Sequence, residues 1–286
     1  MKGWAYVVQA DHSAEAHDIP DAARLVGAVP LVWIHLDGRD PDALEWLRNA
    51  DLPPAALSAL LAQETRPRGD TIGNGILVNL RGPGATPDDD PDRLVSIPIW
   101  ADAGRALSVS LRTLADNPNV CDQMKRGEIL DPGDLVTAIA TMITRTLDPD
   151  VAALGDTLDE YESALDDLPI GTARRKIMRV RSAAIDFRRF LQPQRVALDH
   201  LSTAQCGWMN DDDRLHLREA ADRAARMAEE LEAIRERSAL LHEQLTDMRT
   251  EQIDQRALTA ALVALIFLPL AFITGLFGMN VPVPQW

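Results

Sequence analysis

The sequence predicts an α+β protein, in which an N-terminal α/β domain precedes very long helices and a membrane-spanning segment. Three observations predict this fold. Short runs rich in β-branched and aromatic residues alternate with helical runs up to about residue 115. An apolar repeat with steps of three and four residues then continues over about five heptads. The most apolar stretch of the chain follows that repeat.

Residues 1–130 are predicted to form the α/β domain. Gly, Pro and Asp clusters bound five expected strands, at residues 4–9, 31–36, 75–81, 94–100 and 106–112. Helices are expected at 41–50 and 53–64, since each run has proline near its start. Residues 82–92 are predicted to be a loop between two strands. The glycines at Gly38, Gly73 and Gly75 indicate turns rather than a phosphate-binding loop or a nucleophile elbow.

Residues 131–256 are predicted to form a long-helix stalk, made of a helical hairpin and a longer stalk helix. The helical pattern opens at Pro132 and is expected to break at Pro149 and again near Pro169. Residues 172–190 are the most basic part of the chain. Ion pairs with acidic neighbours on adjacent helices are the favoured explanation, and anionic lipid headgroups or the acidic face of a partner are the alternatives. The cations are Arg174, Arg175, Lys176, Arg179, Arg181, Arg188 and Arg189.

The stalk helix is marked by a seam that begins at Leu217. Nine of its eleven positions are apolar, which predicts packing against other helices. An uninterrupted helix from residue 211 to 279 would form a rod of roughly 100 Å, which suits a stalk better than a compact domain. The seam positions are 217, 220, 224, 227, 231, 234, 238, 241, 245, 248 and 252.

Residues 257–279 are predicted to be a transmembrane helix. No ionisable side chain follows Arg256, and 23 residues are long enough to cross a hydrocarbon core of about 30 Å. Twelve of the 23 are Leu, Ile, Val or Phe. These twelve contribute roughly −4 to −7 kcal/mol to insertion at about −0.3 to −0.6 kcal/mol each.

Small residues repeat along one face of this segment, which allows helices to approach closely or to line a narrow channel. The candidate pore-lining residues are Ala257, Ala260, Ala264, Leu268, Ala271 and Gly275. Pro269 is expected to bend the helix, because it lacks a backbone donor. Gly278, Met279 and Asn280 then form a candidate pore mouth, where an amide oxygen could hold a cation through its water shell. A plain helix end followed by a loop explains the same residues.

Composition narrows the function. The net charge of −15 argues against a nucleic-acid partner. Residues 1–170 hold 29 acidic and 13 basic side chains, which would concentrate cations, although solubility explains this acidity equally well. Cys121, Cys206 and the six histidines show no ligand spacing, so no metal ligand is assigned among them. No signal peptide is recognised, so residues 1–256 are expected to be cytoplasmic.

The ordered set of motifs resembles the CorA-type metal-ion transporters, the two-helix GxN superfamily. Gly278-Met279-Asn280 is similar to their Gly-Met-Asn signature. ETRPR at 64–68, RRFLQPQRVAL at 188–198 and IFLPLAFITGLFGMN at 266–280 resemble the ZntB zinc-transporter branch. The likeness covers nearly the whole chain in the expected order.

This resemblance implies a funnel-shaped homopentamer in the cell inner membrane that transports Zn²⁺ and has the Gly-x-Asn loop at its outer mouth. It also implies a second transmembrane helix, which residues 280–286 do not reach. Mg²⁺ or Co²⁺ transport is the first alternative, because the stripe offers no Cys or His for zinc. A non-conducting, membrane-anchored coiled-coil scaffold is the second. An enzyme is not expected, and no resident cofactor is expected. Regulatory cations are expected to bridge acidic groups between neighbouring subunits of the funnel, but no residue can be assigned to these sites.

Overall fold

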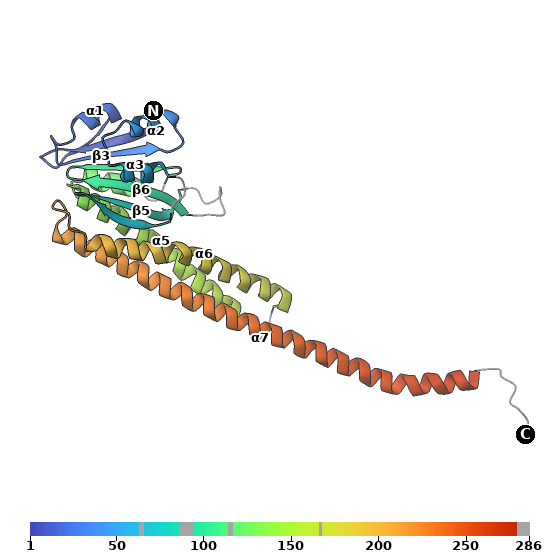
Figure 1. The fold of residues 1–286 in the computed structure, drawn as a ribbon. Coiled ribbons are helices and arrows are strands. Elements are labelled where there is room, and N and C mark those ends of the chain that lie inside the picture. Colours follow the sequence, from blue (N-terminus) through green and yellow to red (C-terminus); the bar gives the residue numbers. More distant parts are fainter. Residues whose placement is uncertain (63–65, 86–93, 114–116, 166–167, 279–286) are drawn as a thin grey trace, which may run out of the picture.

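The computed structural model describes residues 1–62, 66–85, 94–113, 117–165 and 168–278. One mixed β-sheet lies at one end of the molecule, and three long helices extend away from it (Figure 1). The last helix continues far beyond the other two. The predicted fold class is therefore confirmed.

The sheet has seven strands in the order β2-β1-β3-β7-β6-β5-β4. Among the described strands, β3 and β7 alone pair in parallel, with Ile34 opposite Leu107, and the other neighbours are antiparallel. The strands are β1 (Gly3–Val8), β2 (Ala14–His17), β3 (Leu31–Asp37), β4 (Arg68–Ile72), β5 (Gly75–Pro83), β6 (Leu94–Asp102) and β7 (Arg105–Ser110).

Both faces of the sheet are covered. Trp33 of β3 belongs to the core beneath the long helices, whereas Val32 and Ile34 belong to the core under α1 (Ile19–Arg24), α2 (Pro41–Arg48) and α3 (Pro54–Leu61). Side chains alternate between the two faces of a strand, so a strand buried on both sides is apolar throughout. This explains why the five apolar runs were recognisable as strands.

Four elements were not predicted, namely β2, β4, α1 and α4 (Asn117–Lys125). The two strands are the outermost strands of the sheet and consist largely of polar or charged residues. Their pairing is set by the neighbouring strand rather than by an apolar pattern of their own. The predicted loop at 82–92 is wrong at its start, because Gly82 and Pro83 pair with Val95 and Leu94. Residues 86–92 of that loop lie outside the described residues.

The long helices are α5 (Pro132–Ser163), α6 (Ile170–Ser202) and α7 (Asp211–Gly278). The predicted break at Pro149 is wrong, because α5 continues through it. Leu147 and Val151 are buried on either side and hold the helix in place. Pro149 itself is exposed, so the backbone carbonyl that loses its helical donor can bind water.

The seam of α7 is confirmed as the buried face of that helix. Leu217, Leu231 and Leu245 are buried among residues of α5 and α6, and Met248 packs at the edge of the same core. Gln252, the last seam position, is exposed. The three helices therefore form a bundle that ends near residue 248, while α7 continues alone.

Among the described residues, the expected ion pairs of the basic stretch are found for Arg188 alone. Arg188 Nε lies 3.2 Å from Glu232 Oε2 on α7. Arg175 donates to the Thr172 hydroxyl, and Lys176 lies over the ring of Tyr161. Within the described ranges, Arg174, Arg179 and Arg181 form no ion pair. The prediction that the stretch as a whole is neutralised by acidic neighbours is wrong.

Candidate cation pathway and acidic cluster

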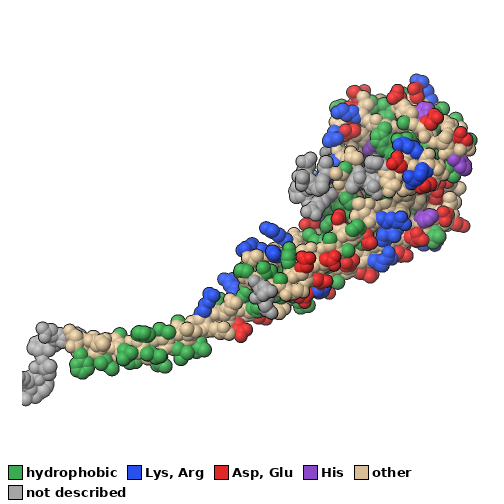
Figure 2. All heavy atoms as spheres, turned by 180° about the vertical axis from the view of Figure 1, so that it is seen from behind, with side chains coloured by type: hydrophobic (Ala, Val, Ile, Leu, Met, Phe, Trp, Pro, Cys, Tyr) green, Lys and Arg blue, Asp and Glu red, His purple; other side chains and the backbone are tan. Residues whose placement is uncertain are grey.

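The C-terminal part of α7 is an isolated apolar helix. Every described residue from 249 to 278 is exposed, including Leu265, Phe267 and Phe277 at 71%, 64% and 85%. Figure 2 shows hydrophobic side chains along the whole narrow end of the molecule, with charged side chains confined to the wider part. By length and composition, α7 is the one described helix able to cross a membrane. Removing so much apolar surface from water requires a lipid bilayer or other protein chains.

The predicted pore-lining residues lie along this exposed part of α7. Ala257, Ala260, Ala264, Leu268, Ala271 and Gly275 fall at steps of three and four residues, which places them on one side of a helix. A Cβ atom added to Gly275 or Gly278 would meet no atom within 4 Å. In the single chain these residues are exposed and pack against no other helix, so their role in lining a pore stays a prediction. Gly278 is the last described residue, and Met279 and Asn280 lie outside the described residues.

Pro269 lies inside α7. Its ring occupies the place of a backbone donor to the carbonyl of Leu265, and such a position bends a helix. Figure 1 shows the axis of α7 changing direction toward its C-terminal end. The role of Pro269 in this change of direction stays a prediction.

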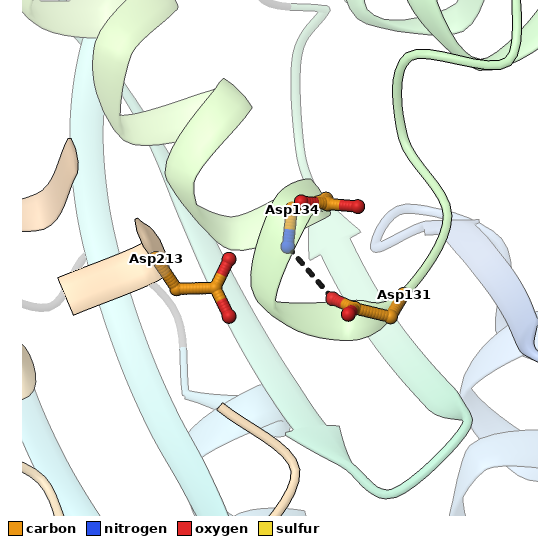
Figure 3. A group of neighbouring side chains, drawn as sticks. All are labelled: Asp131, Asp134 and Asp213. Atoms are coloured by element: carbon orange, nitrogen blue, oxygen red, sulfur yellow. Dashed lines mark hydrogen bonds between the residues drawn. The ribbon is translucent and has the colours of Figure 1, made fainter. Parts of the chain in front are cut away.

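A second feature is a cluster of three carboxylates where the first turns of α5 and α7 meet. Asp131, Asp134 and Asp213 each offer a carboxylate oxygen, and these atoms lie within 4.8 Å of one another. Figure 3 shows Asp213 pointing from α7 toward the two aspartates of α5. Asp213 is only 1% exposed. The three oxygen atoms are close enough to bind one divalent ion together, and hard cations such as Mg²⁺ prefer such ligands.

Helix capping accounts for the position of each carboxylate. Asp131 Oδ1 accepts a hydrogen bond from the backbone N–H of Asp134 at 2.9 Å and caps α5. Asp134 accepts from the N–H of Leu130. At α7, Asn210 Oδ1 accepts from the N–H of Asp213, and Asp213 Oδ2 accepts from the N–H of Asn210, both at 2.9 Å. This reciprocal pair is a capping box.

The electrostatics of the cluster are unfavourable for three ionised groups. The pKa of Asp213 is raised to about 6, mainly by burial and in smaller part by the charges of Asp131 and Asp134. Burial is also the main cause that raises the pKa of Asp134. Like charges at this distance disfavour the ionised form of each other. Protonation or a bound cation would relieve the repulsion.

The helix caps can be recognised in the sequence, but the meeting of the three carboxylates cannot. Asp131-Pro132 and Asn210-Asp211 are recognisable helix starts. Their meeting depends on α5 and α7 running side by side in the same direction, which no local pattern shows.

Gly133→Ala is expected to destabilise the protein by about 1–3 kcal/mol, because the added methyl group would collide with the carboxylate of Asp213. That carboxylate is buried and is held by Asn210, so it cannot swing away. Denaturant unfolding of the detergent-solubilised chain measures the loss. Gly171→Ala is the matched control, because its new Cβ would meet only the tip of Arg175, at 3.9 Å. Equal stability of the two variants would contradict this packing argument.

Comparison with known proteins identifies the family. The family model described as "CorA-like Mg2+ transporter protein" matches residues 30–286. The zinc transport protein ZntB of Yersinia enterocolitica is 31% identical over 263 residues, which cover 91% of this chain and 80% of that protein. The divalent cation transporter CmaX of Pseudomonas aeruginosa is 32% identical over 254 residues, covering 87% of this chain and 76% of that protein.

Solved structures agree with this assignment. The full-length CmaX structure superposes with a TM-score of 0.84 at 29% identity, covering 99% of this chain and 90% of that chain. The CorA magnesium transporter of Methanocaldococcus jannaschii has the same fold, with a TM-score of 0.79 at 18% identity, covering 100% of this chain and 89% of that chain. This chain therefore belongs to the family of CorA-like Mg²⁺ transporter proteins.

Proposed function

We propose that this chain is a subunit of a homopentameric transporter of divalent cations, with Zn²⁺ as its main cargo. The observation that carries the proposal is the exposed, uncharged end of α7, which has small residues on one side. Five such helices around an axis would bury their small faces against a narrow channel and leave Leu, Ile and Phe to the lipid. The names of the relatives in Yersinia and Pseudomonas support divalent cations as cargo.

In this proposal residues 257–279 cross the inner membrane and residues 1–256 lie on the cytoplasmic side. Arg249 and Arg256 flank the N-terminal end of the apolar helix, and basic residues are favoured at the cytoplasmic surface. Gly278, Met279 and Asn280 would then form the outer mouth. A ring of Asn280 side chains would bind the water shell of the cation through amide oxygens.

Different observations favour Zn²⁺ and Mg²⁺ as the transported ion. The relatives named ZntB favour Zn²⁺. The stripe from Ala257 to Gly275 has no Cys or His, and the description of the family names Mg²⁺, so Mg²⁺ is the second candidate. Selection in such a channel would act on the hydrated ion rather than on direct ligands.

Flux into liposomes tests the proposal. The chain is reconstituted around a trapped zinc-sensitive dye, and external Mg²⁺ or Co²⁺ is added as competitor. Zn²⁺ uptake is expected, and Asn280→Ala should reduce it about tenfold, because a hydrogen bond to a charged group contributes about 1.5–3 kcal/mol.

Asn74→Ala, in a turn of the sheet domain, is the matched control and should transport normally. Mg²⁺ uptake that Zn²⁺ does not inhibit would favour the second candidate. A pentamer that transports no divalent ion would contradict the proposal and favour the scaffold.

A further inference from the structure

The outer face of α6 is an unpartnered stripe of apolar and basic residues. Met178, Ile185 and Val196 are 42%, 46% and 55% exposed, although they are large apolar side chains. Their spacing places them on one side of the helix. Arg175 and Arg189 are exposed beside them. We call this surface the α6 face.

The outer face of α5 has the opposite character. Asp148, Asp156 and Glu160 are exposed, and small residues such as Ala152 lie between them. In the part of the chain that the structure describes, these three carboxylates form no ion pair. Asp159 and Glu162, by contrast, both bind Arg237 of α7. We call the unpaired surface the α5 face.

The two faces do not neutralise each other within one chain. A groove of about 600 Å³ separates α5 from α6, and residues such as Tyr161, Arg179 and Phe187 line it. This separation indicates that an external anionic surface completes the α6 face.

A membrane surface does not fit this position. Contacts with α7 show where each residue of α5 and α6 lies along the long axis of the bundle. We call this axial position the height of the residue. Arg188 of α6 lies beside Glu232, and Asp159 of α5 lies beside Arg237, five residues further along α7. The carboxylates of α5 therefore stand at the same height as the arginines of α6. The end of the bundle nearest the apolar segment carries both signs of charge, which gives little attraction to anionic lipid.

We propose that the α6 face of each protomer docks on the α5 face of the next copy of the chain. Neighbouring protomers of a cyclic ring are related by rotation without translation along the ring axis. A residue of α6 in one protomer therefore meets the residues of α5 that have the same height in the next protomer. The two contacts with α7 described above give the height of every residue on α5 and α6. Ile185 has about the same height as Asp156. Arg189 is level with Ala152, and Arg181 is level with Glu160. Apolar side chains of α6 then meet small residues, and its arginines meet carboxylates. This inference rests on the ring assembly proposed above and identifies the surfaces that close it.

Cross-linking between two singly modified chains tests this arrangement. Chains with Ala152→Cys and chains with Gln192→Cys, both lacking Cys121 and Cys206, are co-expressed, purified and treated with a short bis-maleimide. Cross-linked dimers of the two different chains are expected. Chains that all carry Ala152→Cys, or all carry Gln192→Cys, are the controls and should not cross-link, because like faces lie apart. Cross-linking between like faces would overturn the proposal.

A charge exchange gives an independent readout. Arg181→Glu and Glu160→Arg should each lower the fraction of assembled rings in native mass spectrometry, and the double variant should restore it. Circular dichroism of each variant checks that the helices remain folded. A ring that forms without α5–α6 cross-links would overturn this interface and leave the proposed function intact, whereas a chain that forms no ring would contradict the proposed function itself. If Arg181→Glu abolishes binding to phosphatidylglycerol vesicles and leaves the rings unchanged, and the two different chains do not cross-link, α6 serves lipid instead and the proposal is overturned.

Discussion

Arginine at both Ile266 and Ile273 is expected to remove the chain from the membrane fraction. Each exchange replaces about −0.3 to −0.6 kcal/mol by about +2.5 to +3.5 kcal/mol at the centre of a bilayer helix. Together the two substitutions oppose insertion by about 6–8 kcal/mol, which cancels the roughly −4 to −7 kcal/mol that the apolar residues contribute. Extraction of membranes with alkaline carbonate, followed by immunoblotting, measures the distribution.

Leu240→Arg with Ile253→Arg is the matched control. Both residues are exposed, at 65% and 53%, and lie on the same helix before the apolar segment. This control should stay in the membrane fraction. If the Ile266 and Ile273 variant resists extraction as the control does, the apolar end of α7 does not insert in the way argued above.

Asp213→Asn is expected to stabilise the protein at neutral pH by about 2–3 kcal/mol. The pKa of Asp213 is raised to about 6 from an ordinary value of 3.8, so the folded protein holds the proton more tightly than the unfolded chain. The free energy of unfolding therefore falls as the pH rises from about 4 to about 6, by about 1.4 kcal/mol per pKa unit, and stays lower above that range. Asn keeps an oxygen that accepts from the N–H of Asn210, but it carries no charge to repel Asp131 and Asp134.

Denaturant unfolding at pH 4, 5, 6 and 7 tests this prediction. EDTA is included so that no cation neutralises the cluster. The difference between variant and parent should be near zero at pH 4 and should grow until about pH 6. The difference between variant and parent is free of contributions from the other carboxyl groups. One of these is Asp37, whose pKa is lowered by Arg39, so that its contribution to the free energy of unfolding rises with pH instead of falling. A constant difference across the range would contradict the raised pKa of Asp213.

The sequence predicted the features that follow from a periodic pattern. The seam from Leu217 to Leu245 and the uncharged run after Arg256 are both continuous along one helix, so local spacing was sufficient to recognise them. The buried strands were visible for a similar reason, because β3 begins with four consecutive apolar residues.

The features that sequence reasoning missed depend on tertiary contacts. Asp213 is about 80 residues from Asp131 and Asp134 in the sequence, and the cluster forms only because α5 and α7 begin beside each other. The unpaired arginines of α6 are a second case. Their acidic neighbours on α5 are present in the sequence, but the folded chain leaves a groove between the two helices. Composition alone predicts the net charge of a region, but it does not predict which charged side chains form ion pairs.

Cysteine accessibility during ion flux tests the central claim most directly, namely that copies of the end of α7 surround a cation pathway. Cysteine is placed at Ala264 or Ala271 on the small-residue side, and at Ile266 or Ile273 on the other, in a chain lacking Cys121 and Cys206. Two residues correspond to a turn of about 200° around the helix, so the two pairs face nearly opposite directions. A charged, membrane-impermeant thiol reagent should block Zn²⁺ or Mg²⁺ flux through the Ala264 and Ala271 variants and leave the Ile266 and Ile273 variants conducting. Equal block at all four positions, or block only at the isoleucines, would contradict the claim.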